Sequence, residues 1–536
     1  MYHRLSRRSF LAVASAFVAS CNEGGRQRVS FNHGVASGDP LHDRVIIWTR
    51  VTTPNWYDDV EVKWQLARDP TMRSIVAHGR VNANMLRDFT VKIDVTGLEP
   101  ARSYYYVFSA AGERSVIGRT RTLPRDRADA ARLAMVSCSN LPIGLFNVYA
   151  LIARRADLDA VLHLGDYLYE YANFTFGDGN LLGRVPDPDK ELVSLQEYRL
   201  RHAQYKADAD LQAAHRQHPF ICVWDDHEIS NNAWKDGAEN HNPELGEGDW
   251  QVRKRAAIRA YFEWMPIRAS DQDPGERIYR QFRFGDLADL LMLDTRIHGR
   301  DRQLPAIGPG GGLPVDDPLV NDAARTLLGF DQEAWLTESL AVSQADGMTW
   351  RLLGQQVMMA QSSPDNGRTF FGSDQWDGYI PSRQRLFDTV RTHDVDNLVV
   401  LTGDVHSSWA NELSENPWNA AGYDPATGRG VLGVEFVTPG VTSPGVPDPV
   451  LAAQISVSVR SVSPHTKYAE FNKRGYVLLD LDRERIQGEF WHVATVDVPS
   501  RDETMAAAFI NEAGANRLQP TASASIARQE IEPAGE

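Results

Sequence analysis

Polar residues that bind metals or move protons stand directly after four short apolar runs in this sequence. The runs are residues 133–136, 160–164, 220–223 and 398–401. The segments that follow them are 137–140 (Ser-Cys-Ser-Asn), 165–170 (Gly-Asp-Tyr-Leu-Tyr-Glu), 224–228 (Trp-Asp-Asp-His-Glu) and 402–406 (Thr-Gly-Asp-Val-His). Functional groups of an α/β sheet gather just beyond the carboxyl ends of its strands. We therefore expect these thiol, phenol, carboxylate and imidazole groups to form one metal site.

Each segment taken alone has a simpler explanation. A Gly-Asp pair after a strand is most often a turn, and a lone Cys138 is most often a small buried apolar side chain. Asp225 and Asp226 fit the start of a helix, where acidic residues are favoured. Tyr169 fits a packed aromatic residue, and His406 fits a hydrogen-bonded core histidine. The conjunction of such residues at four successive strand ends is what points to a shared site.

The elements that must position these residues belong to two kinds of structure. After residue 131, compact apolar runs separated by candidate helices predict buried strands in a layered α/β domain. The candidate helices cover residues 195–214, 250–264 and 382–393. The glycine-rich stretch 308–312 predicts a loop.

The N-terminal part has a different pattern. Val60, Val62, Trp64 and Leu66 alternate with polar residues, as expected for a strand with one buried face. The series Phe89, Val91, Ile93, Val95 and the series Tyr104, Tyr106, Phe108 repeat this alternation. Several short strands at this spacing predict a small all-β sandwich of the fibronectin type.

Length and charge limit the function. A chain of 536 residues is long enough for two domains. We place the β-sandwich at residues 28–125, the α/β domain at 130–500, and a tail with a possible lid helix at 501–536. The net charge of −15 makes binding to a nucleic-acid polymer unexpected, because such partners call for a basic surface. Three cysteines do not form a disulfide framework.

The first 21 residues predict export. Ser-Arg-Arg-Ser-Phe-Leu at positions 6–11 is a twin-arginine pattern, and an apolar stretch follows it. We expect the twin-arginine (Tat) machinery as a partner and a periplasmic, cell-surface or secreted location. Val-Ala-Ser-Cys at 18–21 resembles a lipobox, which would attach the protein to a membrane through lipidated Cys21. Ordinary cleavage near this point is the alternative.

Two more motifs carry a family resemblance: residues 31–40 (Phe-Asn-His-Gly-Val-Ala-Ser-Gly-Asp-Pro) and 47–50 (Ile-Trp-Thr-Arg). Together with the four strand-end segments, they resemble the PhoD-like alkaline phosphatases over residues 31–492. The resemblance implies a calcineurin-like, four-layered αββα metallophosphatase domain preceded by the β-sandwich. It also implies hydrolysis of phosphomonoesters, with Fe³⁺ and Ca²⁺ as cofactors. Some members of this family cleave phosphodiesters of phospholipid or nucleotide type.

Carried over onto matching positions, the resemblance gives six metal ligands. They are Cys138, Asp166, Tyr169, Asp226, Asp404 and His406. Cys138 and Tyr169 would bind iron, Asp166 would bridge two metals, and Asp226 stands where related phosphatases often have asparagine. Neighbours such as Asp225 leave some of these assignments open.

The resemblance also implies catalytic roles near the metals. His227 would stand near the leaving group and Asn140 near the phosphate. Arg296, at the end of a further apolar run, fits either a bidentate phosphate contact or a structural salt bridge.

The charges of the implied ligands favour this choice of metals. The thiol, the phenol and the carboxyl groups of Asp166, Asp226 and Asp404 carry five negative charges if all ionise. Two zinc ions would leave the site negative, whereas one Fe³⁺ with two Ca²⁺ would leave it positive and attract phosphate despite the acidic chain. Such metals would activate water for attack on phosphorus.

Two other functions remain open from the sequence. A phosphodiesterase of phospholipase D type would use the same site with a wider mouth. A surface binding module with an inactive metal site would show broken ligand positions, and the six positions above are all occupied by residues that bind metals.

Overall fold

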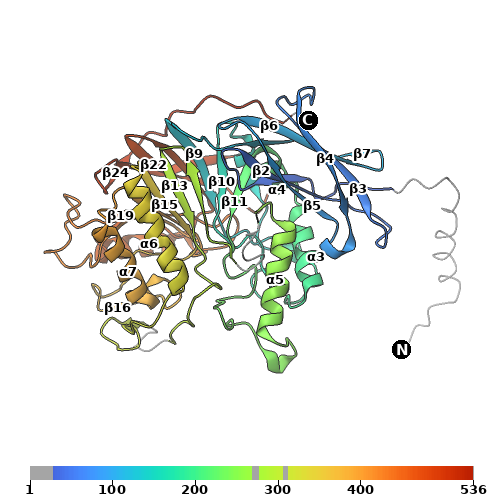
Figure 1. Cartoon of the computed structure of the whole chain (residues 1–536). Coiled ribbons are helices and arrows are strands. Elements are labelled where there is room, and N and C mark those ends of the chain that lie inside the picture. The colour runs from blue at the N-terminus through green and yellow to red at the C-terminus, as the bar shows by residue number, and fades with distance from the viewer. Residues whose placement is uncertain (1–27, 269–276, 306–311, 535–536) are drawn as a thin grey trace, which may run out of the picture.

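The computed structural model describes residues 28–268, 277–305 and 312–534. The predicted signal segment with Cys21, and most of the glycine-rich loop, lie outside these ranges. Two large sheets stack in the centre of the molecule, and helices flank them (Figure 1). None of the helices in the described ranges combines the length and the apolar character needed to span a bilayer.

The predicted β-sandwich is present at the N-terminus. One of its sheets has the order β4-β3-β6-β7, and β8 pairs with β6. In β3, Val60, Val62 and Leu66 are buried while the residues between them are exposed or half-buried, as the alternation predicts. These strands are β3 (Val60–Ala67), β4 (Ile75–Ala83), β6 (Ser103–Ala110), β7 (Glu113–Arg114) and β8 (Gly118–Arg121).

The other layer of the sandwich belongs to a much longer sheet. β1 pairs in parallel with β11, with Ser37 opposite Pro219 and Gly38 opposite Phe220. The layer consists of β1 (Val35–Gly38), β2 (Arg44–Arg50) and β5 (Thr90–Thr96). The two predicted domains therefore share a sheet, and the boundary between them stays a prediction. The alternation within a strand predicts which of its faces is buried, but not which strand pairs with its edge.

The ten-stranded sheet has the order β24-β23-β22-β21-β9-β10-β11-β1-β2-β5. Its central strands β9, β10 and β11 run parallel and correspond to three of the predicted apolar runs. Besides β1, β2 and β5, the sheet contains β9 (Ala130–Val136), β10 (Ala160–His163), β11 (Pro219–Cys222), β21 (Gly475–Asp482), β22 (Arg485–Val493), β23 (Glu503–Glu512) and β24 (Leu518–Thr521).

The seven-stranded sheet has the order β12-β13-β15-β17-β19-β18-β20. Its central strands β13, β15, β17 and β19 are parallel, and β17 is the fourth predicted run. The strands are β12 (Arg280–Phe284), β13 (Ala288–Met292), β15 (Trp350–Gln355), β17 (Leu398–Thr402), β18 (Ser408–Leu413), β19 (Gly433–Val437) and β20 (Thr466–Glu470). β14 (Leu313–Pro314) and β16 (Thr369–Phe370) form a separate pair.

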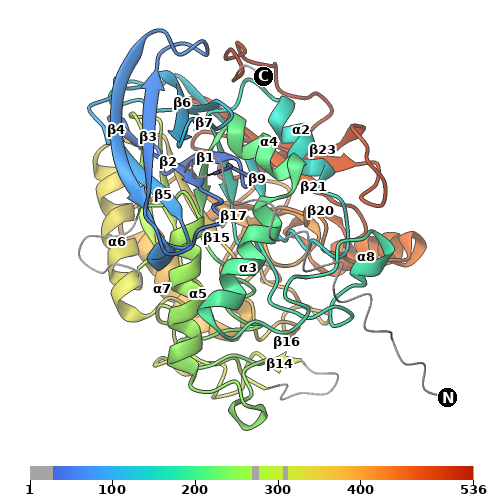
Figure 2. The same cartoon turned by 90° about the vertical axis from the view of Figure 1, so that its right-hand side faces the viewer.

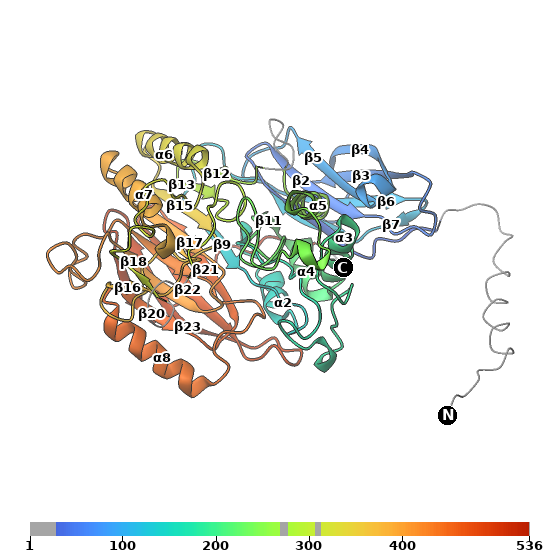
Figure 3. The ribbon, with the colours of Figure 1, turned by 90° about the horizontal axis from the view of Figure 1, so that it is seen from below.

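Helices cover the two outer faces and complete the four-layered αββα arrangement (Figures 2 and 3). α2 packs against α4, α3 against α5, and α6 against α7, while α8 packs against β20. The helices are α2 (Asn147–Arg154), α3 (Leu195–Lys206), α4 (Ala209–Gln217), α5 (Trp250–Trp264), α6 (Phe330–Ala345), α7 (Ile380–Thr392) and α8 (Pro449–Val462). The predicted α/β fold is confirmed.

The predicted helix over 195–214 is two helices. Asp208 ends the first run and caps α4, because its carboxylate accepts hydrogen bonds from the backbone amides of Asp210 and Leu211, each at 3.0 Å. The predictions for α5 and α7 agree with the structure within two residues.

The prediction of a lid helix in the tail is wrong. The Ala-rich segment forms the strand β23, paired with β22, and β24 follows it at the edge of the sheet. The rest of the tail returns toward the β-sandwich, where the hydroxyl of Tyr105 donates to the carbonyl of Glu532 at 2.6 Å. Pairing with an available sheet edge outweighs the helix propensity of alanine.

Candidate metal centre

The four polar segments meet where the two sheets abut. β9, β10 and β11 are adjacent in one sheet and end at the same edge, while β17 contributes from the other sheet. The segment after β9 is joined to the one after β10 by backbone hydrogen bonds, from Cys138 to Gly165 at 3.2 Å and from Ser139 to Asp166 at 2.8 Å. A Cβ added at Gly403 would lie 2.9 Å from Ser137, so the segment after β17 approaches the same place.

The backbone turns sharply as three of the four segments leave their strands. Cys138, Asp166, Asp404 and His406 have φ values of 61°, 54°, 64° and 51°, in the left-handed region that side chains other than glycine rarely adopt. Gly165, with φ of 101°, lets two segments touch, because a Cβ there would lie 2.3 Å from Asp225. Unusual backbone conformations of this kind cluster at functional sites.

Glu228 ties two of the segments together. Its buried carboxylate accepts backbone N–H groups from Asp166 (3.0 Å), Tyr167 (2.6 Å) and Asp225 (2.8 Å). The loop after β10 and the loop after β11 are thus fixed to the same side chain. Glu228 thereby sets the positions of Asp166 and its neighbours without being a predicted ligand.

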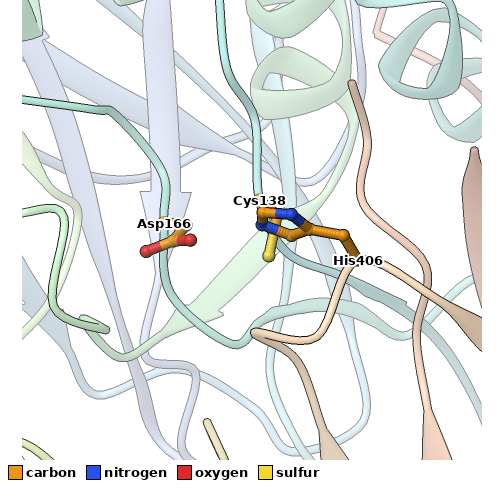
Figure 4. A group of neighbouring side chains, drawn as sticks. All are labelled: Cys138, Asp166 and His406. Carbon is orange, nitrogen blue, oxygen red and sulfur yellow. The ribbon is translucent and has the colours of Figure 1, made fainter. Parts of the chain in front are cut away.

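The first group of candidate ligands contains Cys138, Asp166 and His406, whose donor atoms lie within 4.8 Å of one another (Figure 4). Tyr169 joins this group: its hydroxyl donates to Asp166 Oδ2 at 2.7 Å and lies 3.2 Å from His406 Nε2. The hydroxyl of Ser443 donates to the Tyr169 oxygen at 2.7 Å. Four of the six predicted ligands therefore surround one point.

Two further groups are linked to the first through shared residues. One contains Asp166, Asp226 and His227, and the other contains Asp225, Asp226 and Asp404. Asp166 belongs to the first and second groups, and Asp226 to the second and third. Shared carboxylates are what a centre with several metal ions requires, because one carboxylate bridges two ions.

Unpaired buried oxygens fit this interpretation. Asp166 Oδ1, Asp225 Oδ2 and Asp226 Oδ1 are buried and have no hydrogen-bond partner among the described residues. A buried carboxylate oxygen without a partner is costly in free energy. Cations coordinated by these oxygens would remove that cost, so the residues fit metal ions.

The acidities of the ligands point the same way. Burial raises the pKa of the Cys138 thiol and of the Tyr169 phenol well above their ordinary values, with the nearby Asp166 adding to both effects. Burial also raises the pKa of Asp166 well above its usual range, and that of Asp404 to about 6 although Arg296 opposes the shift. Without added positive charge these groups hold protons, and metal ions would supply the charge that lets them ionise.

His227 is held by Glu170. The Nδ1 atom of His227 lies 2.7 Å from Glu170 Oε2, and the backbone N–H of Asn231 donates to Glu170 Oε1 at 2.7 Å. Burial works to lower the pKa of His227, but the carboxylates of Asp226 and Glu170 outweigh it and raise that pKa well above the ordinary value. The carboxylates around His227 by themselves therefore favour its protonated form.

Arg296 is surrounded by carboxylates. Its side chain is fully buried, with Nη1 2.8 Å from Asp374 and Nη2 2.6 Å from Asp404, and Nε contacts Asp225. These contacts match the salt-bridge alternative, and a phosphate contact stays a prediction.

Asn140 lies in the same region: its Nδ2 donates to the carbonyl of Phe176 at 3.0 Å, and its buried Oδ1 has no partner among the described residues.

Several residues that shape the site were not predicted from the sequence. Glu170 and Glu228 stand within the strand-end segments, so their place directly after a predicted strand could have identified them. Ser443 follows β19, a fifth strand end beside β17. Asp374 and Gln375, whose Nε2 donates to Asp404 Oδ2 at 2.7 Å, come from a loop with no apolar run before it.

Comparisons with known proteins match the chain over most of its length. Residues 133–490 match the family model described as PhoD-like phosphatase, and residues 16–124 match its N-terminal domain. The chain is 35% identical over 512 residues to alkaline phosphatase D of Bacillus subtilis (strain 168), covering 92% of this chain and 83% of that protein. A solved structure titled "Structure of PhoD" superposes with a TM-score of 0.82 at 32% identity, over 95% of this chain and 94% of that one.

Replacing Glu228 with glutamine tests whether loop positioning controls metal binding. A glutamine amide has one acceptor oxygen, so at least one of the three N–H groups loses its partner. We expect metal affinity to fall by roughly ten- to a hundredfold, the range for residues that orient metal ligands. Competition titration against a chelator measures it, with the exposed Glu113→Gln as control. Unchanged affinity in Glu228→Gln would contradict the positioning role.

Proposed function

Because this chain belongs to the PhoD-like phosphatase family, whose members are metal-dependent phosphoester hydrolases, we propose that it is an exported enzyme of alkaline-phosphatase type acting on phosphomonoesters. The observation that carries the proposal is the set of three ligand groups joined through Asp166 and Asp226. A surface binding module with an inactive metal site would have lost some of the metal-binding residues. All six predicted positions hold such residues, and these lie close together in the described structure.

We assign Fe³⁺ to the group that contains Cys138 and Tyr169, and Ca²⁺ to the group of carboxylates. Thiolate and phenolate ligands suit iron, while calcium takes oxygen ligands. Asp166 would be held in common by iron and a second metal. Asp225, Asp226 and Asp404 offer oxygen atoms within 4.8 Å of one another, as a calcium site requires.

When bound, the metals supply positive charge that polarises the phosphoryl group and acidifies a water molecule. The chain supplies the rest. Asn140 positions the phosphate through Nδ2, which carries two N–H groups and uses one of them to donate to the carbonyl of Phe176. Burial of Cys138, Asp166 and Tyr169 excludes bulk water from the reacting atoms.

His227 lies in the second ligand group, but we assign it to proton transfer and not to metal binding, because a protonated imidazole has no free lone pair for a metal. It delivers a proton to the departing oxygen. Its Nδ1 donates to Glu170, so the other ring nitrogen, Nε2, is the one left to act on the substrate. Attack of water on phosphorus breaks the bond to the leaving oxygen, and the proton of the imidazolium neutralises that oxygen as an alcohol. Glu170 keeps the ring oriented and favours its protonated form.

Cleavage of phosphodiesters is the second candidate function. A cleft of about 840 Å³ is lined by Asn232, whose backbone N–H donates to Asp226, and by Asp374, which pairs with Arg296. A cleft this close to the candidate ligands offers room for a larger substituent on phosphorus. This space favours a diesterase of phospholipase D type as the alternative within the same chemistry.

The proposal that the protein is exported rests on its sequence alone. The twin-arginine pattern at residues 6–11 supports a route that carries folded, metal-loaded protein across the membrane. Lipidation of Cys21 or cleavage nearby gives either a membrane-attached or a free product.

Replacing Asp166 with asparagine tests the proposed function. We expect turnover of a monoester and of a diester to fall by more than about a hundredfold, since Asp166 is shared by two ligand groups. Phosphate and alcohol release under matched conditions measure it, and circular dichroism checks the fold. A folded Asp166→Asn variant with normal activity would refute the role of the shared carboxylate.

Colour tests the assignment of iron. A phenolate bound to Fe³⁺ absorbs visible light by charge transfer, so the pure protein is expected to be coloured and Tyr169→Phe to be bleached. Tyr171→Phe is the matched control, because Tyr171 packs edge-on against His227 at 5.1 Å and belongs to none of the ligand groups. A colourless, fully active protein that contains zinc alone would contradict the assignment.

A further inference from the structure

One apolar aromatic side chain, that of Phe176, packs against the first group of candidate ligands. Its ring stacks on the imidazole of His406, with the ring centroids 6.0 Å apart and 21° between the ring planes. The same ring lies 5.9 Å from the ring of Tyr169. The Tyr169 hydroxyl and His406 Nε2 are themselves 3.2 Å apart, so Phe176 packs across two neighbouring ligands at once.

The ligand on which Phe176 stacks is the one that solvent reaches. Cys138, Asp166 and Tyr169 are buried, whereas His406 is half-buried. Phe176 is half-buried as well. An apolar ring stacked on the half-buried ligand keeps water from part of its surface, and the apolar surroundings of a metal site control the access of solvent.

Phe176 also supports the surroundings of His227. Its ring meets the ring of Tyr171 edge-on, with the centroids 6.1 Å apart. Tyr171 and Tyr169 in turn pack against the imidazole of His227, at 5.1 and 4.2 Å. One side chain therefore contacts His406 directly and His227 through two tyrosine rings.

The backbone that carries Phe176 is fixed to the segment after β9. The carbonyl of Phe176 accepts the hydrogen bond from Asn140 Nδ2 at 3.0 Å. Gly177, with φ of 121°, lies so close to the same segment that a Cβ there would be 2.5 Å from Ile143. Both contacts use backbone atoms of the loop, so they remain available when the Phe176 side chain is changed.

We propose that Phe176 is a positioning residue of the metal centre, whose ring holds His406 and Tyr169 in place and slows the release of the metal ion that they bind. The inference rests on the metal centre of the proposed function and not on the identity of the substrate. A metal ion leaves when a ligand turns away and water takes its place. A ring packed against both ligands opposes the turning of the ligands and the entry of water.

Phe176→Ala tests this role, because it removes the ring and keeps the backbone contacts. We expect the metal-loaded variant to lose its metal to excess chelator roughly tenfold faster than the wild-type protein, the lower end of the effect of residues that orient metal ligands. Metal analysis of protein samples desalted at successive times measures the rate. Phe176→Tyr restores the ring and is expected to release metal at nearly the wild-type rate.

Two controls separate the contacts of this ring from other effects of losing a phenylalanine. Phe174→Ala removes the same type of side chain from the same loop, where its ring is 71% exposed. Phe509→Ala removes a buried ring from β23, outside the ligand groups, and weakens the packing of the fold there. Both variants are expected to keep the wild-type rate of metal release.

Equal release rates in Phe176→Ala and in the wild-type protein would overturn the inference. It would also be overturned if Phe176→Tyr released metal as fast as Phe176→Ala, or if either control did so, since general loosening would then be the cause. If Phe176→Ala does not fold, Phe176→Leu replaces it, because leucine fills much of the volume but has no flat face for His406. Faster release from Phe176→Leu supports the inference, and a wild-type rate overturns it.

The same measurement separates failure of the inference from failure of the proposed function. A wild-type protein that holds metal, but whose release rate does not depend on the ring at position 176, loses only the positioning role. A wild-type protein that binds no metal would overturn the proposed function, and the inference with it.

Discussion

The structure depends on one constraint: several acidic side chains are buried together at the ends of strands, where their negative charges repel. Asp166, Asp225 and Asp226 are almost fully buried, and each keeps a carboxylate oxygen without a partner among the described residues. Arg296 balances part of this charge through Asp225, Asp374 and Asp404. The remaining charge fits cations, and the linked groups of candidate ligands are where these would bind.

Most of the surrounding structure holds these groups in place. Parallel strands in two sheets bring their carboxyl ends to one edge, and left-handed residues turn the chain just after β9, β10 and β17. Glu228 ties two loops to each other, and Glu170 orients His227. The site is thus positioned by backbone and by carboxylates that are not ligands, which is how a buried charged centre keeps its geometry.

Local charge also explains how an acidic chain acts on an anionic substrate. The net charge of the chain is −15, but salt screens surface charges beyond about 10 Å. A cluster of multivalent cations at the strand ends determines the field at the phosphoryl group.

The sequence predicted those parts of the fold that local patterns determine. The apolar runs predicted the four strands, and the alternation of apolar and polar residues predicted the β-sandwich. The polar residues after each strand predicted the candidate ligands, which the structure brings together. The pairing of β1 with β11 was not predictable, because a strand pattern does not identify its edge partner. The helix expected in the tail is the strand β23, since sheet pairing outweighs the propensity of its alanines. Asp374 reaches the site from a loop without any pattern that marks it.

Metal analysis of the purified wild-type protein, combined with X-ray absorption at the iron edge, tests the central claim most directly. The account predicts more than one metal ion per chain, iron among them, with a sulfur neighbour that disappears in Cys138→Ser. A protein that holds a single ion or none, or iron without a sulfur neighbour, would contradict the convergence of these ligands on a metal cluster.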